Sequence, residues 1–277
     1  MAGKRTLAGI LGAVTLLFTA CGAAPAADEK ETGEIFSVDI LSTGKSDCAL
    51  IRLDDLVILS DTADADDFPA IRALLDSYGV ERIDYMILSH YDKDHIGSAA
   101  ALVRAYPVGE ILAPDYWETS LEYAEIQAAC DETGTPWTRL TEDRVVETAH
   151  GGFRADPPDR NYGDDNNNSL LTTVTWKGKN LLFLGDAKKK RMEEFLTAAE
   201  DAYAFIKLPH HGDSCKPLLQ LIRQSSPVWA VETVSAFEAV EPELLTTLEG
   251  AGVTLYLTRD GPVSVTWNSK DFDVIQK

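Results

Sequence analysis

The sequence predicts an α/β (α+β) protein with two facing β-sheets and helices on their outer sides, a four-layer αββα sandwich. From about Glu34, short apolar segments with the composition of β-strands follow one another. Helical segments interrupt them, and this pattern of strands broken by helices occurs twice. With 277 residues, 45% of them hydrophobic, the chain can bury a substantial core. We therefore expect one globular domain over residues 34–277.

The first half of this domain contains apolar runs that end at polar turns. The expected strands lie at 34–41, 48–53, 56–61, 83–89 and 109–114. The expected helices lie at 66–79, 97–106 and 117–134, the first and last of which end at glycines that suit a helix C-terminus. Short strands are expected between Pro136 and Phe153.

The second half begins with a loop at 154–168, whose Pro, Gly, Asp and Asn content disfavours both helix and central strand. Strands are then expected at 169–176, 180–186, 204–208, 228–232, 253–258, 262–267 and 272–276. Helices are expected directly after Asp186, at 216–224 and at 242–252. The segment 209–215 is predicted to be a loop.

The charge of the chain is strongly negative, with 25 Lys and Arg against 45 Asp and Glu and a net charge of −20. Such a surface repels the phosphate backbone of nucleic acids, except where basic residues cluster locally. One such cluster is "KKKR", Lys188–Arg191. We favour a solvated first helical turn for it. The alternative is that some of these cations face the active site and attract a phosphate.

The N-terminus has the pattern of an export signal. Lys4 and Arg5 precede the apolar run 7–18, and "FTAC" resembles the lipobox of bacterial lipoproteins, with Cys21 as the lipidated residue. We expect a signal peptide at 1–20, a flexible linker at 21–33 and an extracytoplasmic protein held at the cell membrane by lipid. The apolar run is short for a membrane span. Plain secretion and an uncleaved anchor are the alternatives.

Three cysteines remain if Cys21 carries lipid, so at most one disulfide can form and the chain is not a disulfide scaffold. Cys48 lies in the apolar run "CALI" and is expected to be a small buried residue. Cys215 is expected to begin a helix, with a role as metal ligand as the alternative.

The stretch "SHYDKDHIG", residues 89–97, carries side chains that bind metals. His90, Asp92 and Asp94 alternate, so in an extended segment they face the same way, and His95 follows at the turn. Zinc, manganese and iron accept imidazole and carboxylate ligands. A polar turn with an aspartate that caps the next helix is the alternative. We favour the metal site because a solvated turn rarely needs two histidines.

"LSHYDKDHIG" resembles the His-x-His-x-Asp-His motif of the metallo-β-lactamase fold. The version with Asp at the second ligand resembles the hydrolase domain of ComEC competence proteins and their stand-alone relatives. Further segments resemble that family in the same order: "FSVDILSTGKSDCALIRL", "LVILSDT", "NNNSLLTTVTWKGKNLLFLGDA" and "IKLPHHGDS". The residues that the resemblance places near the substrate or behind the ligands are Asp47, Asp61, Asn166, Asn167, Ser169 and Lys207.

The chain departs from the family pattern in three loops where glycine is usual. Ser46, Ala63 and Ser98 occupy these positions, and Asp213 interrupts the "HHGS" pattern. The first three replacements put the loop geometry in doubt, because glycine allows backbone angles that other residues resist. They remove no ligand.

The resemblance implies two divalent metal ions, zinc or manganese. His90 and Asp92 would hold one ion, Asp94 and His95 the other, and Asp186 would bridge both. The aspartate at the second ligand position makes the first site rich in oxygen, which shifts its preference from zinc toward manganese.

Either His210 or His211 would complete the second site, with the other contacting substrate. The residues expected to be catalytic are Asp94, Asp186 and His211. The family usually lacks a third histidine in the first site. His150 is a conceivable substitute, although we favour a surface position at a strand end for it.

Two cations held in this way lower the pKa of a bridging water and clamp the attacking and leaving oxygens. The resemblance therefore implies a metal-dependent hydrolase that uses a bridging hydroxide, with a small-molecule or nucleic-acid phosphodiester as substrate and no obligate protein partner. A β-lactam, amide or ester hydrolase is an alternative, against which the missing second histidine weighs. A lipoprotein that holds metal without turnover is the other alternative.

Overall fold

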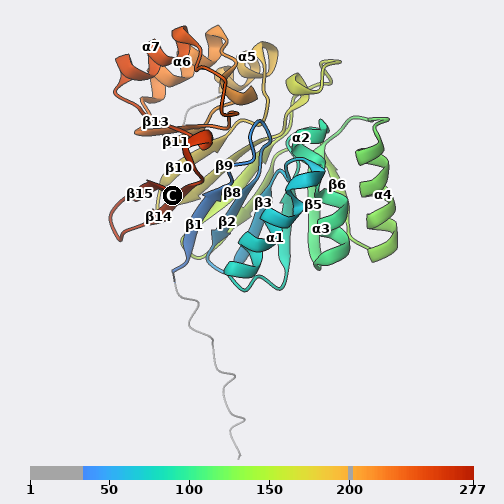
Figure 1. Ribbon diagram of the computed structural model, residues 1–277. Helices are drawn as coiled ribbons and strands as arrows, with labels where there is room; N and C mark the ends of the chain where they lie inside the picture. The colour runs from blue at the N-terminus through green and yellow to red at the C-terminus, as the bar shows by residue number, and fades with distance from the viewer. Residues whose placement is uncertain (1–33, 199–201) are drawn as a thin grey trace, which may run out of the picture. The chain divides into compact units, whose positions relative to one another are not determined.

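The computed structural model describes residues 34–198 and 202–277 (Figure 1). The expected signal peptide, the linker and Cys21 lie outside the described residues. Among the residues that are described, no helix is long and apolar enough to cross a membrane.

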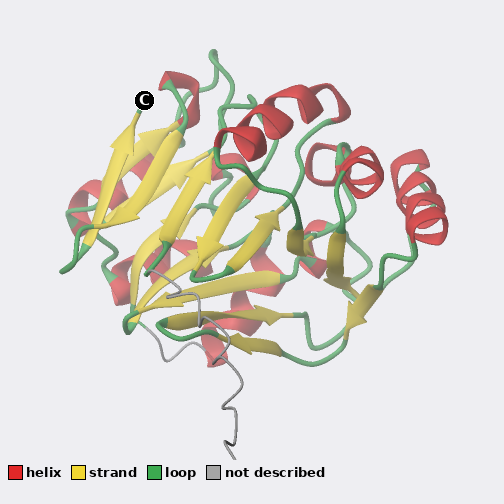
Figure 2. Cartoon of the chain, turned by 90° about the horizontal axis from the view of Figure 1, so that it is seen from below, coloured by secondary structure: helices red, strands yellow, loops and turns green. Residues whose placement is uncertain are grey.

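Two mixed sheets face each other, with helices on their outer sides (Figures 1 and 2). One sheet has the order β15-β14-β1-β2-β3-β4-β5-β6 and the other β13-β12-β11-β10-β9-β8-β7. The predicted αββα sandwich is confirmed. Each sheet combines antiparallel hairpins with a run of parallel strands, namely β3 to β6 in the first and β10 to β13 in the second.

The strands of the eight-stranded sheet are β1 (Phe36–Ile40), β2 (Ala49–Leu53), β3 (Leu56–Ser60), β4 (Ile83–Ile87), β5 (Val108–Pro114), β6 (Trp137–Leu140), β14 (Val263–Trp267) and β15 (Phe272–Gln276). Those of the seven-stranded sheet are β7 (Arg144–Glu147), β8 (Gly151–Asp156), β9 (Leu171–Trp176), β10 (Lys179–Phe183), β11 (Tyr203–Lys207), β12 (Trp229–Glu232) and β13 (Thr254–Leu257). The helices are α1 (Phe68–Ser77), α2 (Lys93–Ile96), α3 (Ala99–Ala105), α4 (Leu121–Thr133), α5 (Lys189–Ala198), α6 (Lys216–Ser225) and α7 (Pro242–Ala251).

The hydrophobic core has three parts, which correspond to the spaces between the four layers. Residues such as Ile51, Trp176 and Phe205 fill the space between the sheets. Helices α1, α3 and α4 pack on the eight-stranded sheet, and α5, α6 and α7 pack on the seven-stranded sheet (Figure 1). Strands with nearly continuous burial, such as β1 and β9, are covered on both faces for this reason.

Two expected boundaries need correction. The predicted loop at 154–168 begins too early, because Arg154–Asp156 pair with β9 as the end of β8. The helix expected at 117–134 begins only at Leu121, since the Ser120 hydroxyl caps it by accepting a hydrogen bond from the Tyr123 backbone N–H.

Candidate metal centre

The predicted ligands gather at the carboxyl ends of strands from both sheets. His90 follows β4, Asp186 follows β10 and His211 follows β11. Carboxyl ends of parallel strands are the usual location of ligand sites in sheets covered by helices. The two sheets thus bring ligands that are far apart in the sequence to one place.

The segment after His90 is not extended as expected. Asp92 has extended backbone angles, but its carbonyl oxygen accepts hydrogen bonds from the His95 and Ile96 backbone N–H groups. Helix α2 therefore begins at Lys93 and carries Asp94 and His95 in one turn. The predicted alternation of three side chains is wrong beyond Asp92, and a helical turn brings the next two ligand candidates together instead.

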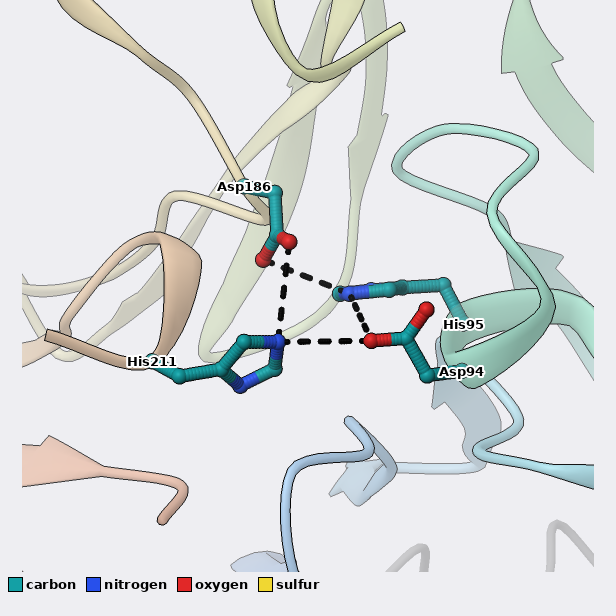
Figure 3. Close-up of side chains that lie close together, drawn as sticks. All are labelled: Asp94, His95, Asp186 and His211. Atoms are coloured by element: carbon teal, nitrogen blue, oxygen red, sulfur yellow. Dashed lines mark ion pairs between the residues drawn. The ribbon is translucent and has the colours of Figure 1, made fainter. Parts of the chain in front are cut away.

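Four side chains form a compact cluster: Asp94, His95, Asp186 and His211 (Figure 3). His211 Nε2 lies 3.4 Å from Asp94 Oδ2 and 3.6 Å from Asp186 Oδ2. His95 Nε2 lies 3.3 Å from Asp186 Oδ1. One nitrogen or oxygen from each residue can therefore reach a common point.

His90 and Asp92 form a second group beside this cluster. His90 Nε2 lies 3.4 Å from Asp92 Oδ2 and 3.8 Å from Asp186 Oδ2. The His90 side chain is fully buried, whereas that of Asp92 is 41% exposed. Asp186 thus lies between the two groups, with Oδ1 near His95 and Oδ2 near both His90 and His211.

The hydrogen bonds of the three histidines show that these residues fit divalent cations. Nε2 of His90, His95 and His211 and Oδ1 of Asp186 are buried and have no hydrogen-bond partner among the described residues. Leaving such atoms unpaired in a protein interior costs about 1–3 kcal/mol each. Ligation to a cation would satisfy all four.

The Nδ1 atom of each histidine, by contrast, has an anchor. His95 Nδ1 donates to Asp61 Oδ2 at 2.9 Å, His90 Nδ1 to Ser89 Oγ at 3.0 Å and His211 Nδ1 to Thr233 Oγ1 at 3.2 Å. Anchors of this kind fix the tautomer and the ring orientation of histidines that bind metals. All three Nε2 lone pairs are thereby directed toward the carboxylates.

Two buried aspartates stand behind these anchors. Asp61 also accepts from the Ser89 backbone N–H at 2.7 Å and from Ser89 Oγ at 2.8 Å. Asp47 accepts from Thr233 Oγ1 and forms a buried ion pair with Lys207. Both aspartates therefore support the histidines from behind.

Electrostatics in the cluster favour a positive charge at its centre. Burial alone would lower the pKa of His95, but the carboxylates of Asp186 and Asp61 raise it well above its usual value. Burial alone would raise the pKa of Asp186, yet the neighbouring histidines, led by His95, hold it well below its usual range. A cation bound here would replace the proton on His95, so acid should weaken metal binding.

The "NNNS" segment adjoins Asp186. Asn166 Nδ2 donates to Asp186 Oδ2 at 3.4 Å, and the Asp186 backbone N–H donates to Ser169 Oγ at 3.3 Å. Asn167 Oδ1 accepts from the backbone N–H groups of Lys190 and Arg191 at the start of α5. Asn167 thus caps helix α5. Only Asn166 and Ser169 contact Asp186.

Three predicted candidates lie outside the cluster. His210 Nδ1 pairs with Asp213 Oδ2 at 2.8 Å on the exposed side of the loop. His150 Nδ1 pairs with Asp54 Oδ1 at 2.7 Å, at the turn between β2 and β3 on the opposite end of the sheet. Cys215 stands at the start of α6 and packs partly on the apolar core. Of the two adjacent histidines, the structure brings only His211 to the carboxylates.

The "KKKR" run divides into exposed and buried residues. Lys189 and Lys190 are exposed, but Arg191 is buried. It donates a hydrogen bond to the Ser169 carbonyl oxygen and forms ion pairs with Asp156 and Glu194. The expectation of a fully solvated turn is therefore wrong for Arg191, which instead fixes the loop next to Asp186.

Of the three replaced glycines, only Ala63 adopts the left-handed backbone that glycine favours, with φ of 51°. Ser98 has φ of −90°, and its hydroxyl donates to the Asp64 carbonyl oxygen at 2.6 Å. The Ser46 hydroxyl donates to Asp64 Oδ2 at 3.1 Å. Two of the replacements thus form new contacts to one residue.

An acidic rim borders the exposed side of Asp92. Burial, and then the negative charges of Asp92 and Glu118, raise the pKa of Asp165 to about 6. Asp165 directly precedes Asn166, whose side chain touches Asp186. Neither Asp165 nor Glu118 stands out in the sequence, because acidic residues are common throughout this chain.

Glu232 is another acidic residue that the sequence did not reveal. It is 1% exposed at the end of β12, and a side chain on Gly212, next to His211, would collide with its carboxylate. Burial raises the pKa of Glu232 to about 7, although Arg259 and Lys207 lie near enough to oppose this rise. The sequence does offer one indication of a buried acid, since Glu232 directly follows the apolar run "VWAV".

Glu232→Gln is expected to remove a pH dependence of stability. A carboxyl group whose pKa is raised in the folded state stabilises the protein below its unfolded pKa of 4.5, and that contribution disappears as the pH rises through about 7. The full shift corresponds to roughly 3 kcal/mol. Chemical denaturation of the metal-free proteins at pH 5 and pH 8 should show a smaller loss for Glu232→Gln than for the parent. An equal loss of stability between the two pH values in both proteins would contradict this prediction. The matched control is Glu243→Gln, the same change at an exposed position.

These features are those of a protein class with two facing sheets and candidate histidine and aspartate metal ligands at the strand ends. Residues 41–227 match the family described as Metallo-beta-lactamase superfamily. The chain belongs to this superfamily of metal-dependent hydrolases.

Its curated relatives include a ComE operon protein and a competence protein. ComE operon protein 3 of Bacillus subtilis (strain 168) is 24% identical over 159 residues, 57% of this chain and 20% of that protein. Competence protein ComA of Neisseria gonorrhoeae is 28% identical over 201 residues, 70% of this chain and 26% of that protein. The predicted resemblance to ComEC-like proteins is confirmed, and the chain spans about a quarter or less of these relatives.

Solved structures share the fold at low identity. The metallo-beta-lactamase fold protein YhfI from Bacillus subtilis has a TM-score of 0.55 and 12% identity, with 80% of this chain and 96% of that chain covered. A diphosphatase from the PhnP family has a TM-score of 0.53 and 12% identity, with coverage of 88% and 100%.

Proposed function

We propose that this protein hydrolyses phosphodiesters at a centre of two divalent metal ions. The observation that carries the proposal is the set of buried, unpartnered atoms: three imidazole Nε2 atoms and Asp186 Oδ1 converge in a space of a few ångströms. The relatives named as competence proteins and the neighbour named as a diphosphatase support a phosphate-bearing substrate.

The geometry suggests how the ligands divide. Asp94, His95 and His211 would hold the second ion, and His90 and Asp92 the first, with Asp186 placed to serve both. When bound, two such ions, zinc or manganese, lower the pKa of a shared water and offset the charge of a phosphoryl group.

The remaining groups of the chain orient and support these ligands. Asp61 and Asp47 hold His95 and His211 through Nδ1, directly or through Thr233. His210, whose Nδ1 pairs with Asp213 Oδ2, stands next to His211, and we propose that it contacts substrate.

The charge of the protein bears on the size of the substrate. A net charge of −20 and the carboxylates Glu118 and Asp165 beside Asp92 disfavour a long polyanion. We therefore propose a small diester or a short nucleotide as the preferred substrate. The N-terminal pattern supports an extracytoplasmic location with lipid on Cys21, which we propose on the sequence alone.

Removal of metal should abolish turnover. Protein dialysed against a chelator is expected to leave bis-p-nitrophenyl phosphate intact, and addition of Mn²⁺ or Zn²⁺ is expected to restore p-nitrophenol release, followed at 405 nm. Nitrocefin is tested under the same conditions.

Three results would change the conclusion. Nitrocefin hydrolysis without diester hydrolysis would make the chain a lactam hydrolase. Two bound ions with no hydrolysis of either compound would favour a protein that holds metal without turnover. Diester hydrolysis unaffected by the chelator would mean that the reaction does not depend on a metal ion.

A further inference from the structure

An exposed tryptophan lies on a loop that leads away from the metal centre. Trp117 is 74% exposed, whereas the other four tryptophans of the chain are buried or half-buried. Large aromatic rings contribute to stability and to binding mainly through the apolar area that they bury. A tryptophan left this exposed therefore has a ring surface available to a ligand.

The loop that carries Trp117 begins where β5 ends, at Pro114, and leads into α4. Strand β5 pairs in parallel with β4, the strand that leads into His90, so both loops leave the same edge of the sheet. The Tyr91 backbone N–H donates to Tyr116 Oη at 3.0 Å, and Tyr91 Oη donates to the Pro114 carbonyl oxygen at 2.8 Å. Two hydrogen bonds therefore join this loop to the residue that follows His90.

One face of the Trp117 ring is covered, and the other faces solvent. The Arg139 guanidinium, on β6, lies 3.8 Å from the centroid of the ring. This guanidinium also donates a hydrogen bond to Tyr123 Oη on α4. A cation over one face of an indole is attracted by its π-electrons and orients the ring. Since most of Trp117 remains exposed, the opposite face is open to a ligand.

The charges around this ring favour an uncharged, flat ligand group. A second cation on the open face would be repelled by Arg139 across the ring. A phosphate would be repelled by Asp115 and Glu118, which flank Trp117 in the sequence, and by the net charge of −20. Nucleobases are flat and uncharged, and bases of every kind stack on aromatic side chains.

We propose that Trp117 stacks on the base of a nucleotide whose phosphodiester lies at the metal centre. Diesters that carry a nucleoside would then be preferred over diesters without a base. This inference rests on the proposed hydrolysis of phosphodiesters. The base lies away from the reacting bond, so stacking stabilises the bound substrate and the transition state alike and acts on KM more than on kcat.

Two diesters with the same leaving group test the inference, namely the p-nitrophenyl ester of thymidine 5′-monophosphate and methyl p-nitrophenyl phosphate. Trp117→Ala is expected to lower kcat/KM for the thymidine ester about tenfold, through KM, which is the usual size of a base–aromatic stacking contribution. The methyl diester has no base, so its kcat/KM should be unchanged. Trp117→Phe keeps a ring and should retain most of the preference.

Leu121→Ala is the matched control, because Leu121 is 69% exposed at the start of α4, close to Trp117 in the sequence. It should treat both diesters as the parent does, and circular dichroism should show all variants folded. An equal loss for both diesters in Trp117→Ala would overturn the inference, since Trp117 would then support the loop and not the base.

A binding measurement separates this inference from the proposed function. Thymidine 5′-monophosphate is added to the Zn²⁺-loaded protein and tryptophan fluorescence is followed, with methyl phosphate as the ligand that lacks a base. The nucleotide should quench part of the fluorescence of the parent but not that of Trp117→Phe, and methyl phosphate should quench neither. Such quenching without hydrolysis of either diester would refute the proposed function and leave the stacking site intact. Equal responses of the parent and Trp117→Phe to the nucleotide would overturn the inference, whatever the rates of hydrolysis.

Discussion

Asp186→Asn is expected to lower the rate of bis-p-nitrophenyl phosphate hydrolysis by about 10³-fold or more. Asp186 stands between the two groups of ligands, 3.3 Å from His95 Nε2 in one and 3.8 Å from His90 Nε2 in the other. An amide has the same shape but no charge, so it cannot balance two cations. Loss of the transition-state stabilisation that a metal pair supplies, several kcal/mol, corresponds to a rate factor of this size. Kinetics at saturating Mn²⁺, with bound metal counted by mass spectrometry, provide the measurement.

The matched control is Asp131→Asn, the same change at an exposed position on α4, which should keep the parent rate and two bound ions. Asp186→Asn should retain the fold, because the change removes a buried charge and leaves the volume unchanged. If Asp186→Asn bound metal and matched the parent rate, Asp186 would not bridge. If neither protein turned over the diester while both held metal, a binding lipoprotein would be the better interpretation.

The sequence predicted the layers and most ligand candidates for physical reasons that can be stated. Buried strands such as β4 end in an apolar run, and the polar residues that follow it, such as His90, must lie at a sheet edge. Asp186 and His211 were predicted through the family resemblance. Asp61 and Asp47 were predicted through the family resemblance alone. Their chemistry became evident once the structure showed them at Nδ1 of histidines.

Other parts of the site depend on contacts that no periodicity reveals. The choice of His211 over His210 depends on their contacts, because His210 pairs with Asp213 whereas His211 lies beside Asp94 and Asp186. Ser89 and Thr233 act as hydrogen-bond links only because Asp61 and Asp47 lie behind them. Helix α2 was missed because it comprises four residues, fewer than the helical period needs to show itself.

Lys207→Met is expected to lower the free energy of unfolding by about 3–5 kcal/mol. Lys207 is 4% exposed and pairs with Asp47, which is also buried. Burial alone would raise the pKa of Asp47, but Lys207 and then His95 and His211 lower it below its usual value. Without Lys207, the aspartate would be a buried charge with weaker compensation. Urea denaturation of the metal-free protein at pH 7 measures the loss.

The pH dependence separates this explanation from a loss of packing. A carboxylate with a lowered folded pKa stabilises the protein above its unfolded pKa, and that contribution is lost as the pH falls through the folded value. Removal of Lys207 raises the pKa of Asp47. The free energy of unfolding of Lys207→Met should therefore be closer to that of the parent at pH 5 than at pH 8. The double variant Asp47→Asn/Lys207→Met should recover part of the loss, because no buried charge remains. Lys45→Met, which breaks an exposed pair with Glu238, should cost less than about 1 kcal/mol. An equal loss for Lys207→Met at both pH values would mean that the stem of Lys207, and not its charge, holds this part of the fold.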